Sequence, residues 1–148
     1  MFEETLKSWQ QAASDFIKVA ESVPYDLRQI SGVCGEWSCQ QIVAHLAGWQ
    51  REALKRYGDF QRGQAPTIQY DADTFNTSSI EALKLFSWYE VLDTFRFTTE
   101  DLAKTAKALT PDQIAANTGY EEWLAGLSKD LNEHMTEIRE WLERNNNL

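Results

Sequence analysis

Apolar residues recur along this chain at steps of three and four positions, the spacing that places them on one face of an α-helix. The pattern predicts four long amphipathic helices, at about residues 2–23, 38–57, 88–109 and 120–144. No segment shows a convincing alternation of apolar and polar residues, the pattern typical of a half-buried strand. The sequence therefore predicts an all-α fold, an antiparallel four-helix bundle with short helices in its connections.

Capping residues predict where several of these helices begin. Ser38 and Gln41 have the spacing of a capping box, in which each side chain bonds the backbone N–H of the other residue. Further boxes begin at Ser87 and Thr110, and the second of them opens a brief helix before the last long one.

The longest predicted connection follows the second long helix. Gly58 and Gly63 mark the end of that helix. Residues 58–71 show little periodicity, so we expect a loop that acts as a lid or specificity element. Residues 71–85 predict a short irregular helix, and the asparagines at 145–147 are expected to fray.

Length and composition indicate one globular domain spanning residues 1–148. The formal charge of −9 predicts a field that repels a phosphate backbone, so nucleic acid is not expected as a partner. The chain has neither a secretory signal nor an apolar run of the ~20 residues that span a bilayer, which predicts a cytoplasmic protein without membrane contact. Cys34 and Cys39 match neither redox nor zinc-ribbon spacing, and we expect free thiols.

The candidate chemistry lies with the only two histidines, His45 and His134, each of which falls on an apolar helix face. Asp130 precedes His134 by one turn, so its carboxylate and the imidazole share an inward-looking face. A buried carboxylate requires an ion pair, a hydrogen bond or a metal. Two imidazole nitrogens and one carboxylate oxygen predict a divalent-metal site with open positions, suited to zinc, nickel, manganese or iron.

A blander interpretation also fits the residues. Asp130 and His134 can form a hydrogen bond or ion pair along one helix without any metal, and a lone buried histidine is commonly a hydrogen-bonded core residue. The residues alone leave both interpretations open. Glu52, one heptad after His45, is a candidate catalytic base or extra ligand, or else a solvated glutamate.

Three segments resemble the DinB/YfiT-like superfamily. Residues 35–49, GEWSCQQIVAHLAGW, are similar to its second-helix motif of Trp-Ser, an apolar turn, Ala-His-Leu and Trp. Residues 133–142 resemble its last-helix ending, and residues 71–76 its mid-chain Asp-x-Phe-Asn element. The resemblance implies a four-helix bundle of DinB/YfiT-like topology, often a homodimer, whose members frequently hold a divalent metal on three histidines.

By position, His45 matches the first of these ligands and His134 the last. Asp130 stands where the middle histidine would be. This departure leaves two outcomes, a metal site with altered preference or a site without metal. The resemblance implies kinship with bacillithiol- or mycothiol-dependent transferases, with YfiT-type hydrolases and with the ClbS/DfsB resistance branch.

Two functional hypotheses follow. The first is a metal-dependent hydrolase or low-molecular-weight-thiol transferase that acts on a small molecule, with zinc or nickel held by His45, Asp130 and His134 and manganese or iron as alternatives. The second is a metal-free small-molecule-binding or dimeric interaction protein with a ClbS-like resistance or sequestration role.

Overall fold

A computed structural model describes residues 1–146 of the chain, and these residues form helices and connections without a β-strand. The predicted all-α fold is therefore confirmed. The α-helices are α1 (Phe2–Glu21), α2 (Cys39–Gln61), α3 (Ala72–Ala82), α4 (Trp88–Lys107), α5 (Pro111–Ala116) and α6 (Gly119–Asn146), and a short 3₁₀ turn spans Tyr25–Leu27.

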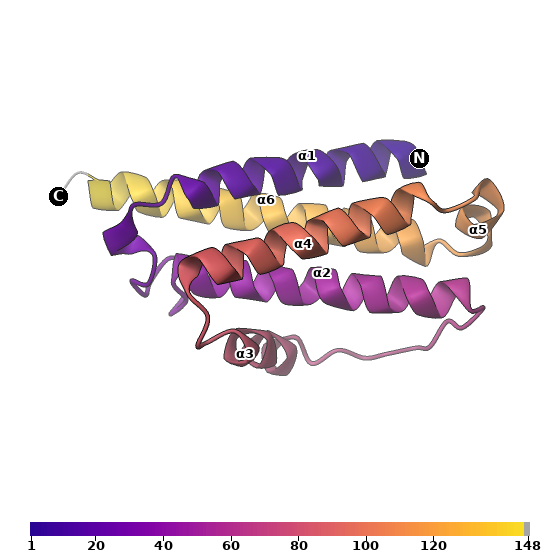
Figure 1. Cartoon of the computed structure of the whole chain (residues 1–148), viewed down its shortest axis with the longest axis horizontal. Coiled ribbons are helices and arrows are strands. Elements are labelled where there is room, and N and C mark those ends of the chain that lie inside the picture. Colours follow the sequence, from indigo (N-terminus) through magenta and orange to yellow (C-terminus); the bar gives the residue numbers. More distant parts are fainter. Residues whose placement is uncertain (147–148) are drawn as a thin grey trace.

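The four long helices α1, α2, α4 and α6 form a bundle in which α2 and α1 each pack against both α4 and α6. Figure 1 shows that α1 and α6 run in one direction and α2 and α4 in the other. The reason is the long connection 62–87, which carries the chain back through α3 to the end where α2 began. Of the neighbouring pairs, α2/α6 and α1/α4 are therefore antiparallel, whereas α2/α4 and α1/α6 are parallel.

The predicted apolar faces meet in the core of this bundle. The largest side chains that are fully buried come from all four long helices, and each contributes about 1.5–3 kcal/mol through its removal from water. The opposite faces are polar, and none of the helices described is long and apolar enough to cross a membrane. Core side chains with 0% exposure include Trp9, Phe16, Ile42, Phe95, Leu124 and Ile138.

The predicted helix starts are confirmed by their hydrogen bonds. Ser38 Oγ accepts from the Gln41 backbone N–H at 3.2 Å, and Gln41 Oε1 accepts from the Ser38 N–H at 2.9 Å. The boxes at Ser87 and Thr110 are also complete. These bonds satisfy backbone N–H groups that have no partner within the helix, so α2 starts at a defined point beside the candidate site.

The end of α2 differs from the prediction, because the helix continues through Gly58 to Gln61. The extra turn is stabilised by Phe60, whose ring packs edge-on against Tyr120 with centroids 5.2 Å apart. The turn stops before Gly63, where φ of +75° favours glycine. The loop is correspondingly shorter than expected.

Helix α3 lies against the outer side of α2, as Figure 1 shows. The close approach requires glycine at position 48, because a Cβ there would come within 2.6 Å of Ser79 Cβ. Asp71 caps α3 by accepting from the Thr74 N–H at 3.2 Å. This packing brings Asn76 of α3 to the surface of α2.

The asparagines expected to fray divide into two groups. Asn145 and Asn146 are helical, and the Asn145 side chain donates to the Trp141 carbonyl at 2.8 Å. Asn147 lies outside the described residues.

Candidate metal centre

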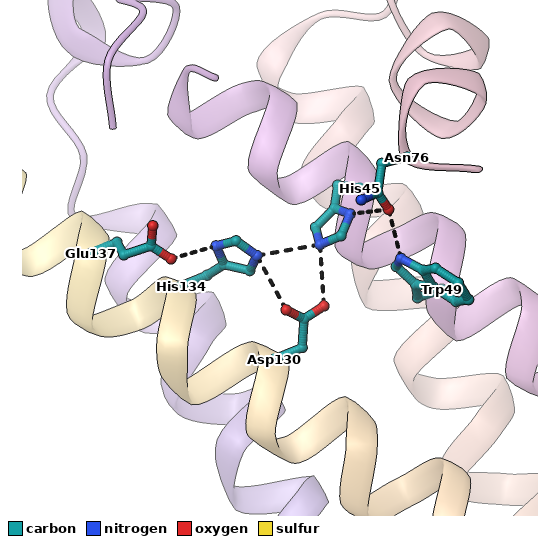
Figure 2. A network of polar contacts seen from close by, with 6 residues as sticks. All are labelled: His45, Trp49, Asn76, Asp130, His134 and Glu137. Carbon is teal, nitrogen blue, oxygen red and sulfur yellow. Dashed lines mark hydrogen bonds and ion pairs between the residues drawn. The ribbon is translucent and has the colours of Figure 1, made fainter. Parts of the chain in front are cut away.

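The structure brings the three predicted ligands together between α2 and α6 (Figure 2). His45 Nε2 lies 3.1 Å from Asp130 Oδ2, and His134 Nε2 lies 3.2 Å from Asp130 Oδ1. The two Nε2 atoms are themselves 3.2 Å apart. One ligand atom from each residue thus lies within 4.8 Å of the others.

The cluster is enclosed on its imidazole side and accessible on its carboxylate side. The side chains of His45 and His134 are 5% and 8% exposed, whereas that of Asp130 is 31% exposed. Trp37, from the connection before α2, packs over both rings, with centroid distances of 4.9 Å to His45 and 6.4 Å to His134. A small molecule can therefore reach the cluster past Asp130 and not past the imidazoles.

Hydrogen bonds on the far side of His45 determine which nitrogen carries its proton. The indole N–H of Trp49, which can only donate, lies 2.8 Å from Asn76 Oδ1, and this contact identifies that atom as an acceptor. The same oxygen lies 2.8 Å from His45 Nδ1, so Nδ1 donates to it. In the neutral ring, the lone pair is therefore on Nε2 and points into the cluster (Figure 2).

The same reasoning applies to His134. Its Nδ1 lies 2.9 Å from Glu137 Oε1, one turn further along α6, and a carboxylate oxygen favours the proton on that nitrogen. The neutral His134 ring then also turns the lone pair of Nε2 toward Asp130. Two lone pairs and one carboxylate converge with no proton between them, which is unfavourable unless a cation or an added proton is present.

The donor set therefore fits a divalent metal. Imidazole Nε2 and carboxylate oxygen are ligands of zinc and of other first-row divalent ions. His45 donates its second ring nitrogen to an oxygen, as metal-bound histidines commonly do, and the second ring nitrogen of His134 lies 2.9 Å from a carboxylate oxygen of Glu137.

An added proton is the competing occupant. Burial alone lowers the pKa of His134, but the hydrogen bond to Asp130 and the charges of Asp130 and Glu137 outweigh it, and the net pKa is raised. Burial alone raises the pKa of Asp130, but hydrogen bonds from His134 and His45 outweigh it, and the net pKa lies well below its usual range. The cluster thus keeps its carboxylate ionised and favours positive charge beside it.

A family profile matches most of this chain. Residues 8–142 match the sequence profile of the DinB superfamily. The chain belongs to the DinB superfamily. The resemblance seen around His45 and His134 is thereby confirmed over nearly the whole length of the chain.

Two solved structures share the fold of this DinB-superfamily chain. An uncharacterised protein from Escherichia coli UTI89 superimposes with a TM-score of 0.83 at 14% identity, over 99% of this chain and 95% of that one. The colibactin self-resistance protein ClbS, solved in complex with a dsDNA, gives a TM-score of 0.68 at 14% identity, over 88% of this chain and 93% of that one. Among curated proteins, no sequence matches the chain.

The expectation that nucleic acid is excluded as a partner is wrong. ClbS has the same fold and was solved in complex with a dsDNA. The expectation rested on the formal charge of −9, but the charge of a whole chain does not describe the local surface that meets a phosphate backbone. Net charge therefore gives no ground for the exclusion.

Glu52, the candidate base, is not part of the cluster. Its Oε2 accepts from the Tyr70 hydroxyl at 2.6 Å and lies 3.6 Å from Arg56 Nε. Its side chain is 13% exposed, so it is not a solvated surface glutamate either. The structure thus places Glu52 in a network that ties the loop after α2 to the helix.

Three residues around the cluster were not singled out from the sequence. Asn76 and Glu137 hold the outer nitrogens of the two histidines, and Trp37 covers their rings. Glu137 follows His134 by three positions, a helical spacing that could have identified it. Asn76 lies in the Asp-x-Phe-Asn element, but its partner is 31 residues away along the chain.

Cys34 lies next to Glu137, and both cysteines are free thiols, as expected. Burial, together with a hydrogen bond to Glu137, raises the pKa of Cys34 to about 12. Burial raises the pKa of Cys39 to about 12 as well. Both thiols are therefore protonated at neutral pH, and neither is an activated nucleophile.

A cavity of about 620 Å³ adjoins the cluster. It lies between α2 and α6, and its lining includes Trp49, Phe60 and Trp123 together with Asp130. Of residues 58–71, expected to provide a specificity loop, Phe60 lines the cavity as part of α2, whereas residues 62–71 do not line it. Asp130 is thus shared by the cavity and by the histidine cluster.

Proposed function

We propose that this protein is a metal-dependent enzyme that acts on a small molecule, with a divalent ion held by His45, Asp130 and His134. The observation that carries the proposal is the convergence of two imidazole Nε2 atoms and one carboxylate, with the outer nitrogens held by Asn76 and Glu137. Zinc and nickel suit the two nitrogens best, and manganese and iron(II) are alternatives that accept the same donors.

A bound ion would lower the pKa of a water molecule or of a low-molecular-weight thiol, the chemistry of a hydrolase or a thiol transferase. Three protein ligands leave positions open for that group. The residues of the chain provide the rest of the site. Trp37 shields the imidazoles from water, Asn76 and Glu137 keep both Nε2 lone pairs directed inward, and the cavity admits a small molecule beside Asp130.

Elemental analysis of protein purified without an affinity tag or chelator tests the proposal, repeated after incubation with zinc, nickel, manganese and iron(II) in turn. We expect about one ion per chain in the wild type, and none in the Asp130→Ala and His134→Ala variants. Asn132→Ala, an exposed position on the same helix, is the matched control and should keep its metal. Circular dichroism shows whether each variant is folded.

The ligand assignment fails if folded Asp130→Ala and His134→Ala proteins bind as much metal as the wild type. It also fails if the wild type binds no metal under any of these conditions.

A second candidate function is metal-free binding of a small molecule, in a resistance or sequestration role. It is supported by the raised pKa of His134, because a proton can occupy the cluster in place of a metal. ClbS, whose fold is similar, is a self-resistance protein. Under this alternative, chelator-treated protein binds its small molecule as tightly as metal-loaded protein, and the two states are compared by calorimetry.

A further inference from the structure

We infer that the cavity between α2 and α6 is the substrate site, and that it takes a small molecule with a flat aromatic body and an amino group. This inference deepens the proposed function and rests on it for the chemistry next to Asp130. It rests on the shape, the aromatic wall and the charges of the cavity, each of which comes from a different set of residues.

The shape follows from the residues on one face of α6. The cavity extends along that face from Gly119 to beyond Asp130, eleven residues apart and about 16 Å at a rise of ~1.5 Å per residue. It stays open in the middle because position 126 is glycine, where an added Cβ would meet none of the described atoms within 4 Å. A long trough rather than a round pocket results, and it suits an elongated ligand.

Aromatic rings from both α2 and α6 line the trough. Trp49 of α2 and Trp123 of α6 form a tilted pair with ring centroids 6.2 Å apart, and Phe60 of α2 lies toward the Gly119 end of the trough. Trp49 is held in place by the hydrogen bond from its indole N–H to Asn76 and by the ring of Phe75, 4.1 Å away. Rings fixed in this way offer an apolar surface to a flat ligand and lose little side-chain entropy on binding.

The charged groups of the trough are mostly acidic. Glu122 lies near one end, and Asp130 and Glu133 lie near the other, while Lys129 is the only basic side chain among the described lining residues. A metal ion would occupy Asp130 and leave Glu122 and Glu133 free. The acidic side chains of the lining outnumber the basic one, so the trough favours a cation, which also binds well against tryptophan faces.

Asp130 connects this site to the cluster. Its carboxylate lines the trough and also contacts both histidines at 3.1 and 3.2 Å. A ligand lying along the trough therefore ends beside the proposed metal ligands, and the aromatic rings orient it there.

Two probes with the same aromatic body and opposite charge test the inference. Binding of 1-naphthylmethylamine and of 1-naphthylacetate is measured by calorimetry at pH 7, on chelator-treated and on zinc-loaded protein. We expect the amine to bind at least tenfold more tightly than the acetate to the chelator-treated protein.

The substitution Gly126→Leu fills the middle of the trough. Since an added Cβ there meets none of the described atoms within 4 Å and leucine is a better helix former than glycine, we expect a folded protein in which the amine binds at least tenfold more weakly. Ala125→Leu, an exposed position that does not line the cavity, is the matched control and should bind the amine as the wild type does.

Three results overturn the inference: no binding of the amine at millimolar concentration, equal binding of both probes, or undiminished binding in folded Gly126→Leu. The proposed metal function is judged separately, by the zinc content of the same variants. If Gly126→Leu loses amine binding and still binds zinc, the result supports the trough as the substrate site. If the wild type binds the amine but takes up no metal, the substrate site is supported and the proposal of a metal-dependent enzyme fails.

Discussion

Removing the Asn76 side chain should weaken metal binding, although Asn76 itself is not a ligand. Its Oδ1 accepts from His45 Nδ1 and from Trp49 Nε1, each at 2.8 Å. In Asn76→Ala, nothing favours the proton on His45 Nδ1, and a proton on Nε2 blocks the lone pair that a metal requires. The residue thus acts by positioning His45.

The size of the effect follows from these two bonds. Loss of an outer partner of a metal-bound histidine typically costs 10–100-fold in affinity, which corresponds to about 1.4–2.7 kcal/mol. In the metal-free protein, the buried His45 Nδ1 also loses its hydrogen-bond partner, which lowers the free energy of unfolding by about 1–3 kcal/mol. Both quantities are measurable, the first by zinc competition with a chromophoric chelator and the second by urea denaturation.

Two further variants separate positioning from a general loss of stability. Asn76→Asp keeps an acceptor oxygen in place and should retain zinc affinity within a few-fold of the wild type. Thr77→Ala, an exposed neighbour on α3, should change neither quantity. Folded Asn76→Ala that binds zinc as tightly as the wild type would refute the assignment of the His45 tautomer.

Other expected outcomes concern the scaffold and pH. Ser38→Ala should lower the free energy of unfolding in urea by about 1 kcal/mol, because the cap of α2 is lost. Gln50→Met removes the hydrogen bonds that Gln50 Nε2 donates to the hydroxyls of Thr98 and Thr99. It should change the free energy of unfolding by less than about 1 kcal/mol, because Gln50 Oε1 has no hydrogen-bond partner among the described residues and both hydroxyls still donate to the Phe95 carbonyl. Because the pKa of His134 is raised in the folded state, its protonated form stabilises the metal-free protein. This stabilisation is fully present below the pKa of the unfolded state, about 6.5, and is lost as pH rises through the pKa of the folded state. The melting temperature of metal-free protein should therefore fall from pH 6 to pH 9 by more in the wild type than in His134→Ala.

The helices could be predicted because their determinants are local. The apolar faces that contain Trp9, Ile42 and Ile138 repeat at helical steps within each segment, and the capping boxes use residues three positions apart. The parallel pairing of α2 with α4 could not be derived in the same way. It depends on the path of residues 62–87, and the spacing of apolar residues does not show in which direction this connection runs. The extension of α2 past Gly58 depends likewise on Phe60 meeting Tyr120, a contact across 60 residues of sequence.

The candidate ligands could be predicted because His45, Asp130 and His134 mark the inward faces of two helices. That these two helices, α2 and α6, contact each other depends on the topology of the bundle. The surroundings of the cluster could not be predicted. Asn76 reaches His45 only because α3 packs closely on α2 at Gly48, and no property of the sequence around Asn76 requires that approach. The sequence pattern identifies candidate ligands, whereas the tautomers that make them ligands are determined by tertiary contacts.

Asp130, at the position where the family resemblance implies a third histidine, adds a negative charge to the site. With neutral imidazoles, Asp130 and Glu137 give the cluster and its nearest contact two negative charges within hydrogen-bonding distance of the rings. One divalent ion balances both charges, and an added proton on His134, whose pKa is raised, balances one of them. A metal ion and a proton are thus alternative sources of positive charge beside Asp130 and Glu137. The metal-free interpretation therefore needs no change in fold. The choice between them depends on metal affinity, and the contacts of Asn76 and Glu137 favour the metal by keeping both inner nitrogens unprotonated in the neutral rings.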